Sequence, residues 1–171
     1  MPALNPEVEN LLEMSRKAGA RPFQDLTPEQ ARAVYAAARD VLQPATEDVA
    51  SVRDVTIPTK TGGLALRVFR GAGTQPDETL PCLVFLHGGG WVIGDLESHD
   101  RVCRAFANRA RICVVAVDYR LAPEHCFPAA LDDSVAALQW VSDNAQALSV
   151  APKRIGVGGD SAGGNLGRCW R

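Results

Sequence analysis

Residues 154–164 read Arg-Ile-Gly-Val-Gly-Gly-Asp-Ser-Ala-Gly-Gly, and this stretch decides the fold. A short apolar strand at 154–158 leads directly into a sequence, 159–163, that matches the pattern G-x-S-x-G. A tight turn between a strand and a helix forces Ser161 into a strained backbone conformation, so its neighbours must be small. The pattern therefore predicts a nucleophile elbow, with the Ser161 hydroxyl at the tip and the positive end of a helix behind it.

Upstream of this turn, short apolar strands alternate with amphipathic helices. We expect strands at 82–86, 112–117 and 154–158, and apolar residues recur at helical spacing over 102–110 and 131–148. Strands that are apolar throughout and separated by helices indicate a mostly parallel sheet with helices on both faces. The predicted fold class is α/β.

The N-terminal part of the chain has a different pattern. Residues 1–45 predict two helices: Asn5 can cap the first, Thr27 and Gln30 form a capping box for the second, and Pro44 ends it. From residue 51 the apolar period becomes two, and 52–57 and 64–69 predict a hairpin through residues 61–63. We divide the chain into N-terminal helices, 1–45, and an α/β part, 46–171.

Composition excludes several classes of protein. The chain has 171 residues, 46% of them hydrophobic and 22% charged, with a net charge of −2. This charge favours neither nucleic acid nor an anionic membrane, and no apolar run reaches the 18 residues of a membrane span. The five cysteines form no C-x-x-C pair, so we expect no metal site, no disulfide framework and a cytoplasmic location.

A glycine-rich loop, His87-Gly88-Gly89-Gly90-Trp91, follows the predicted strand at 82–86. Three consecutive glycines allow backbone amides to face a cavity, as in an oxyanion hole, where Gly88 and Gly89 would donate beside Ala162. A plain turn and a phosphate cradle are the alternatives. The phosphate cradle is disfavoured because the chain has no G-x-x-x-x-G-K-[ST] sequence.

A second polar segment, residues 118–125, follows the predicted strand at 112–117. It places charged and aromatic side chains beside a core strand. We interpret it as a structural knot of hydrogen bonds and ion pairs rather than as a catalytic element.

Taken together, HGGGW, DYRLAPEHCFPAALDD and GDSAGGN resemble the hormone-sensitive-lipase family of serine esterases, which has the α/β-hydrolase fold. The resemblance implies Ser161 as nucleophile and an oxyanion hole from the amides of Gly88, Gly89 and Ala162. It implies a substrate wall from Trp91 and from the N-terminal helices, which resemble part of that family's cap. It also implies that the oxyanion loop is braced by His87, Asp118, Arg120, Glu124 and His125.

The acid and the base of a catalytic triad are missing from the expected place. In this fold they follow the serine, yet neither is among the ten residues after Ser161. His87, His99 and His125 precede the serine, and we assign none of them as the base. Residues 167–171 also break the apolar pattern that the helix after the elbow needs. We therefore expect a truncated or frameshifted product of a longer gene, with about five strands of the full sheet, poor stability and little activity.

These observations predict a carboxylic ester hydrolase that works through an acyl-enzyme on Ser161, without a cofactor. Its partner would be a small-molecule ester, and the resemblance allows a homo-oligomer of the full-length parent. The alternative is a non-catalytic small-molecule-binding protein on the same scaffold.

Overall fold

The computed structural model describes residues 3–19 and 21–169, so Trp170 and Arg171 of the atypical tail lie outside the described residues. Here the chain forms α1 (Pro6–Lys17), a 3-10 turn (Phe23–Asp25), α2 (Pro28–Leu42), β1 (Ser51–Thr59), β2 (Gly62–Arg70), β3 (Leu80–Leu86), α3 (Asp100–Ala110), β4 (Cys113–Val117), α4 (Ala129–Asp143), β5 (Val150–Gly159) and α5 (Ser161–Arg168).

The strands form one five-stranded sheet in the order β1-β2-β4-β3-β5. β4, β3 and β5 are parallel, as the alternation of strands and helices predicts. The predicted hairpin is confirmed as β1 and β2, which pair antiparallel, and β2 also pairs antiparallel with β4. The sheet is therefore mixed, with its parallel half on the side of the predicted elbow.

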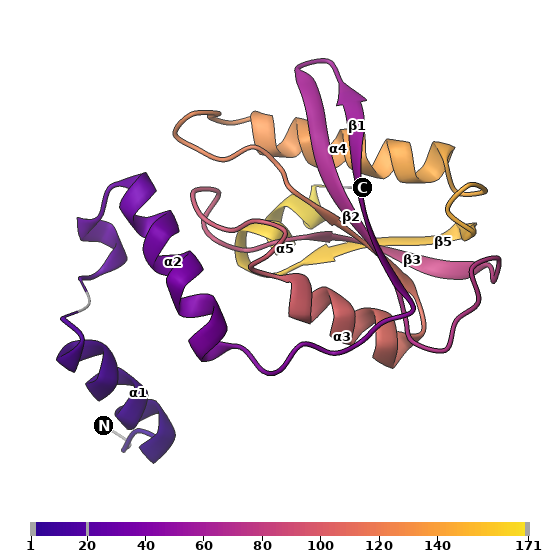
Figure 1. Ribbon diagram of the computed structural model, residues 1–171. Coiled ribbons are helices and arrows are strands. Elements are labelled where there is room, and N and C mark those ends of the chain that lie inside the picture. Colours follow the sequence, from indigo (N-terminus) through magenta and orange to yellow (C-terminus); the bar gives the residue numbers. More distant parts are fainter. Residues whose placement is uncertain (1–2, 20, 170–171) are drawn as a thin grey trace.

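Helices cover both faces of the sheet (Figure 1). α3 lies on one face, and its core cluster consists of Phe69, Phe85, Cys103, Ala107, Val114 and Ala116. α4 and α5 lie on the other face over a larger cluster, to which they contribute Ala130, Ala137, Val141 and Leu166. Every residue of β4 is buried, which explains its unbroken apolar sequence. β5 is mostly half-buried or exposed because it lies at the edge.

The N-terminal helices begin where their caps predict. The Asn5 side chain accepts a hydrogen bond from the Glu7 amide, and Thr27 and Gln30 form both hydrogen bonds of a capping box. α1 and α2 lie to one side of the sheet, and none of the residues of α1 is buried (Figure 1). The apolar stripe of α1 thus lies on the surface.

Two predicted elements have bounds that differ from those their sequence patterns suggest. α4 ends at Asp143, and Asn144 is its C-cap: the backbone amide and the side-chain amide of Asn144 both donate to the Trp140 carbonyl. The apolar pattern continues to Leu148, which is buried in a turn rather than a helix. β5 starts at Val150, four residues before the predicted strand.

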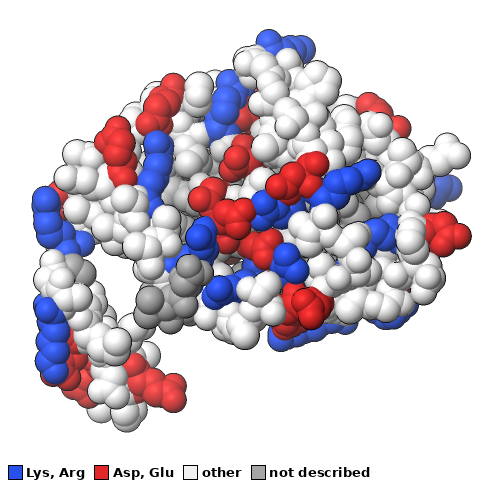
Figure 2. Space-filling view, in the orientation of Figure 1, with Lys and Arg blue, Asp and Glu red and all other residues white. Residues whose placement is uncertain are grey.

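The surface carries charges of both signs. On the face seen in Figure 2, acidic and basic side chains alternate near the middle instead of forming a patch of one sign. Within residues 3–19 and 21–169, no helix has the length and hydropathy needed to cross a bilayer.

Candidate active site

The elbow predicted from the sequence is present between β5 and α5. Ser161 has φ +49°, a left-handed conformation that L-residues rarely adopt, and its side chain is exposed at the turn. The flanking glycines are needed because the turn lies against the end of β3. A Cβ atom on Gly159 would lie 2.0 Å from the Leu86 carbonyl oxygen, and one on Gly163 would lie 1.8 Å from it.

α5 begins at Ser161, and the first amides of this helix have no partner within it. The Asp160 carbonyl accepts hydrogen bonds from the amides of Gly163 and Gly164, at 2.8 and 3.2 Å. The amides of Ser161 and Ala162 precede these two on the first turn, where helical amides have no partner within the helix. The Ala162 amide is therefore placed as a donor at the positive end of the helix.

The predicted role of Gly88 is wrong for this structure. Its amide donates to the Asp160 Oδ1 atom at 2.8 Å, so that donor is already used. A Cβ atom on Gly88 would lie 2.0 Å from Asp160 Oδ2, so the glycine allows this close approach. The physical reason is the carboxylate of Asp160, a position that the pattern G-x-S-x-G leaves open.

The other two glycines of the loop adopt conformations that favour glycine. Gly89 has φ +125° and its carbonyl accepts hydrogen bonds from the amides of Val92 and Ile93, which folds the loop back on itself. Gly90 has φ +60° and lines a cavity. The donors expected from the sequence do not include Gly90, although the run of three glycines could have indicated it.

His87 supports this loop from inside the protein. It is 2% exposed, its ring stacks on Tyr119 at 4.2 Å between centroids, and Nδ1 lies 2.8 Å from the Gly88 carbonyl oxygen. The Tyr119 hydroxyl donates to the His87 carbonyl at 2.6 Å. Burial lowers the pKa of His87, so the ring is neutral at pH 7 and Nδ1 donates to the carbonyl.

The segment 118–125 forms only part of the expected knot of hydrogen bonds and ion pairs. The Arg120 guanidinium is paired with the buried carboxylate of Asp133 at 2.8 Å, whereas the His125 side chain is exposed. Asp118 is half-buried and lines a cavity of about 510 Å³ beneath α2. The segment reaches the loop through its backbone, because the Ala122 amide donates to the Trp91 carbonyl at 2.7 Å.

Glu124 is bound by a helix outside this segment. The Arg32 side chain of α2 makes hydrogen bonds to both carboxylate oxygens of Glu124, at 2.7 and 2.9 Å, and this contact lowers the Glu124 pKa to about 2. Arg32 also donates to the carbonyls of Val92 and Ala122, at 2.8 and 2.9 Å. One side chain thus joins α2 to Val92, the residue directly after the glycine loop, and to the segment 118–125.

Trp91 stands beside an apolar cavity. It has φ +60°, is 40% exposed, and lines a space of about 300 Å³ between the glycine loop, α4 and α5. The remaining lining is mainly apolar and includes Gly90, Phe127, Leu131 and Leu166.

A mixed sheet whose parallel half ends in an elbow serine beside a glycine loop defines the class of the α/β hydrolases. The chain belongs to this family: the model of the alpha/beta hydrolase fold matches residues 83–169.

Two curated relatives and two solved structures illustrate the similarity. The carboxylesterase NlhH of Mycobacterium tuberculosis is 58% identical over 89 residues, which cover 52% of this chain and 28% of the relative. An ethyl acetate hydrolase of Pseudomonas putida is 36% identical over 169 residues, which cover 96% of this chain and 53% of the relative. The chain thus spans about half, or less, of the length of these relatives.

Among solved structures, an ester hydrolase from the metagenome of Lake Arreo has a TM-score of 0.90 at 39% identity, over 98% of this chain and 54% of that one. A hyperthermophilic esterase from Pyrobaculum calidifontis has a TM-score of 0.88 at 42% identity, over 98% and 52%.

Proposed function

We propose that Ser161 is the nucleophile of a carboxylic ester hydrolase and that this chain provides its N-terminal part. The observation that carries the proposal is the left-handed backbone of Ser161, held between two glycines against the Leu86 carbonyl. A serine in this conformation presents Oγ at the tip of the turn. The names of the relatives, which are esterases and carboxylesterases, support ester hydrolysis as the reaction class.

In the proposed reaction, Ser161 Oγ attacks the ester carbonyl carbon and its proton passes to a general base. The bond to the alcohol breaks, the alcohol leaves with that proton, and water hydrolyses the acyl-enzyme. The developing oxyanion would accept hydrogen bonds from the amides of Gly89, Gly90 and Ala162. Gly90 replaces Gly88 in this proposal because the Gly88 amide is bonded to Asp160.

The acid and base of the triad are proposed to lie after residue 171 of the whole protein. The relatives are about twice as long, and the chain order of the fold places both groups after the serine. Without a base the serine hydroxyl is a weak nucleophile. We therefore propose that the 171-residue chain has little hydrolase activity by itself.

The substrate is proposed to be a small ester with an apolar group beside Trp91. The apolar lining of the cavity of about 300 Å³ supports this choice. α1 and α2 are proposed to form part of a cap over the site, since Arg32 of α2 binds Val92, directly after the glycine loop, and the segment 118–125. Neither proposal requires a cofactor.

A chimera tests the proposed nucleophile. Residues 1–169 of this chain would be fused to the second half of the ethyl acetate hydrolase, and the product exposed to a fluorophosphonate probe and a short-chain aryl ester. We expect one probe per chain on Ser161, and loss of turnover by about 10⁶-fold in Ser161→Ala. A folded chimera with an unlabelled Ser161 would overturn the proposal and favour a non-catalytic binding protein.

A further inference from the structure

We infer that His99 is a positioning residue of this site: its imidazole holds the carboxylate of Asp160, and Asp160 holds the glycine loop beside Ser161. The inference deepens the proposed function and rests on it, because it concerns the same elbow and the same loop.

The Asp160 carboxylate joins the two halves of the site. Its Oδ1 atom accepts the hydrogen bond of the Gly88 amide at 2.8 Å and lies 3.1 Å from His99 Nε2. The Asp160 side chain is 54% exposed, so packing alone does not fix its rotamer. Among the described contacts of this carboxylate, His99 is the side chain that can hold it against Gly88.

His99 is itself held tightly. It is 8% exposed, and its ring lies between those of Phe85 and His87, at 5.8 and 5.7 Å between centroids. Its Nδ1 atom lies 2.9 Å from the Ser98 hydroxyl oxygen, and the Asp95 amide donates to that hydroxyl at 2.9 Å. The imidazole therefore has a polar partner on each ring nitrogen.

These partners determine where the His99 proton lies. A carboxylate accepts hydrogen bonds, so Nε2 must carry the proton that faces Asp160. Burial lowers the pKa of His99, so the ring is neutral at pH 7 and Nδ1 has no proton. The Ser98 hydroxyl has a single proton and lies 2.8 Å from the Asp95 carbonyl oxygen as well as 2.9 Å from Nδ1. A neutral ring with its proton on Nε2 requires the Ser98 proton to point to Nδ1 and not to that carbonyl. The hydrogen bonds then run from Ser98 to His99 and from His99 to Asp160, and the Asp160 carboxylate also accepts from the Gly88 amide.

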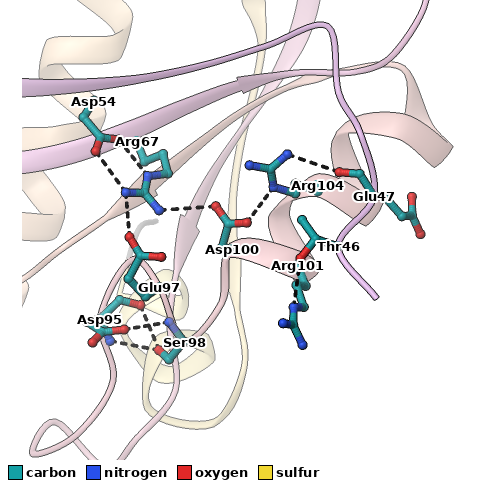
Figure 3. Close-up of polar contacts among 10 residues, drawn as sticks. All are labelled: Thr46, Glu47, Asp54, Arg67, Asp95, Glu97, Ser98, Asp100, Arg101 and Arg104. Carbon is teal, nitrogen blue, oxygen red and sulfur yellow. Dashed lines mark hydrogen bonds and ion pairs between the residues drawn. The ribbon is translucent and has the colours of Figure 1, made fainter. Parts of the chain in front are cut away.

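The segment that carries Ser98 and His99 is anchored to the sheet by Arg67 of β2 (Figure 3). Arg67 binds Glu97 at 2.8 Å and Asp100 at 3.3 Å, on either side of the pair, and binds Asp54 of β1 at 2.7 Å. The Arg67 side chain is only 14% exposed, so these contacts are partly shielded from water. His99 is thus fixed relative to the sheet, and its contact with Asp160 fixes the elbow relative to the sheet as well.

The proton arrangement gives a first test on the unmodified chain. Long-range ¹H–¹⁵N spectra at pH 7.5 report which ring nitrogen of each histidine carries the proton. We expect the Nε2–H tautomer at His99. An Nδ1–H tautomer would overturn the inference, because Nε2 could not then donate to Asp160.

Two conservative variants give a second test. In His99→Gln, the side-chain amide nitrogen replaces Nε2 and can still donate to Asp160, whereas in His99→Asn it replaces Nδ1 and cannot reach that far. We expect hydrogen exchange at the Gly88 amide to rise about tenfold in His99→Asn and to change much less in His99→Gln. Urea unfolding of both variants corrects for global stability.

Equal exchange at Gly88 in the two variants, after this correction, would assign His99 a packing role only and overturn the inference. If neither variant folds, the tautomer measured on the unmodified chain decides. Neither measurement involves hydrolysis, so a failure here leaves the chimera test of Ser161 untouched. Conversely, an unlabelled Ser161 in the chimera leaves the tautomer and exchange results intact.

Discussion

The turn at Ser161 leaves no space for a side chain on the glycines that flank it. The obstacle is the Leu86 carbonyl oxygen, which belongs to the backbone of a central strand and cannot rotate away. This differs from a crowded core, where a flexible side chain can yield.

Gly163→Ala should therefore destabilise the chain by roughly 3 kcal/mol, at the upper end of overpacking. Gly167→Ala is the matched control in the same helix, since its Cβ would lie 3.5 Å from a Val157 methyl group, an ordinary contact. We expect that control to be neutral or stabilising by about 0.5 kcal/mol. Urea unfolding measures both, and similar losses in the two variants would contradict the steric explanation.

The buried histidines should make stability depend on pH. Burial lowers the pKa of His87 and His99 below the ordinary value of 6.5, so the unfolded chain binds protons that the folded chain does not. Stability is then greatest above pH 6.5 and declines as the pH falls, by up to about 1.4 kcal/mol per pH unit for each group.

Urea midpoints between pH 7.5 and 5.5 measure this decline. His125→Gln, at an exposed histidine, is the matched control and should leave the decline unchanged. A midpoint that stays constant or rises with acidification would show that the two imidazoles are not buried in their neutral form.

At the scale of elements, Arg32 joins α2 to the site through hydrogen bonds to Glu124, Val92 and Ala122. Its ion pair with Glu124 involves side chains that are 31% and 46% exposed, and ion pairs this open to water contribute little to stability. The hydrogen bonds from Arg32 to the carbonyls of Val92 and Ala122 are partly buried. The carbonyl contacts should therefore matter more than the ion pair.

Hydrogen exchange of the α2 amides distinguishes the two contributions. We expect Arg32→Ala to accelerate exchange over 28–42 about tenfold, and Glu124→Gln to accelerate it less than about threefold. Equal acceleration in both variants would mean that the ion pair dominates.

How far the sequence predicts an element depends on the range of the contacts that decide it. The elbow and the capping box of α2 are local, so the strained backbone at Ser161 and the cap of Thr27 and Gln30 are predicted correctly. The use of the Gly88 amide depends on Asp160, 72 residues away, and nothing in the local pattern reveals that contact. The pairing of Glu124 with Arg32, 92 residues apart, is hidden for the same reason.

For the molecule as a whole, the sheet order has a consequence that no single element shows. The elbow strand β5 pairs with β3 on one side and lies at the edge of the sheet. Its outer side presents backbone donors and acceptors that no other strand of the five pairs with, and such an edge promotes association between chains.

A charge placed on this edge should reduce association of the 171-residue chain. Gly156 is exposed in the middle of β5, and a Cβ there would have 4.0 Å to its nearest atom, so Gly156→Lys fits the strand. Sedimentation velocity across a concentration series should show fewer oligomers for Gly156→Lys, because a lysine repels a second strand of the same kind. Val52→Lys, on β1 at the opposite edge, is the control and should associate like the unmodified chain. Association that falls only in Val52→Lys would show that the chains associate through the β1 edge instead.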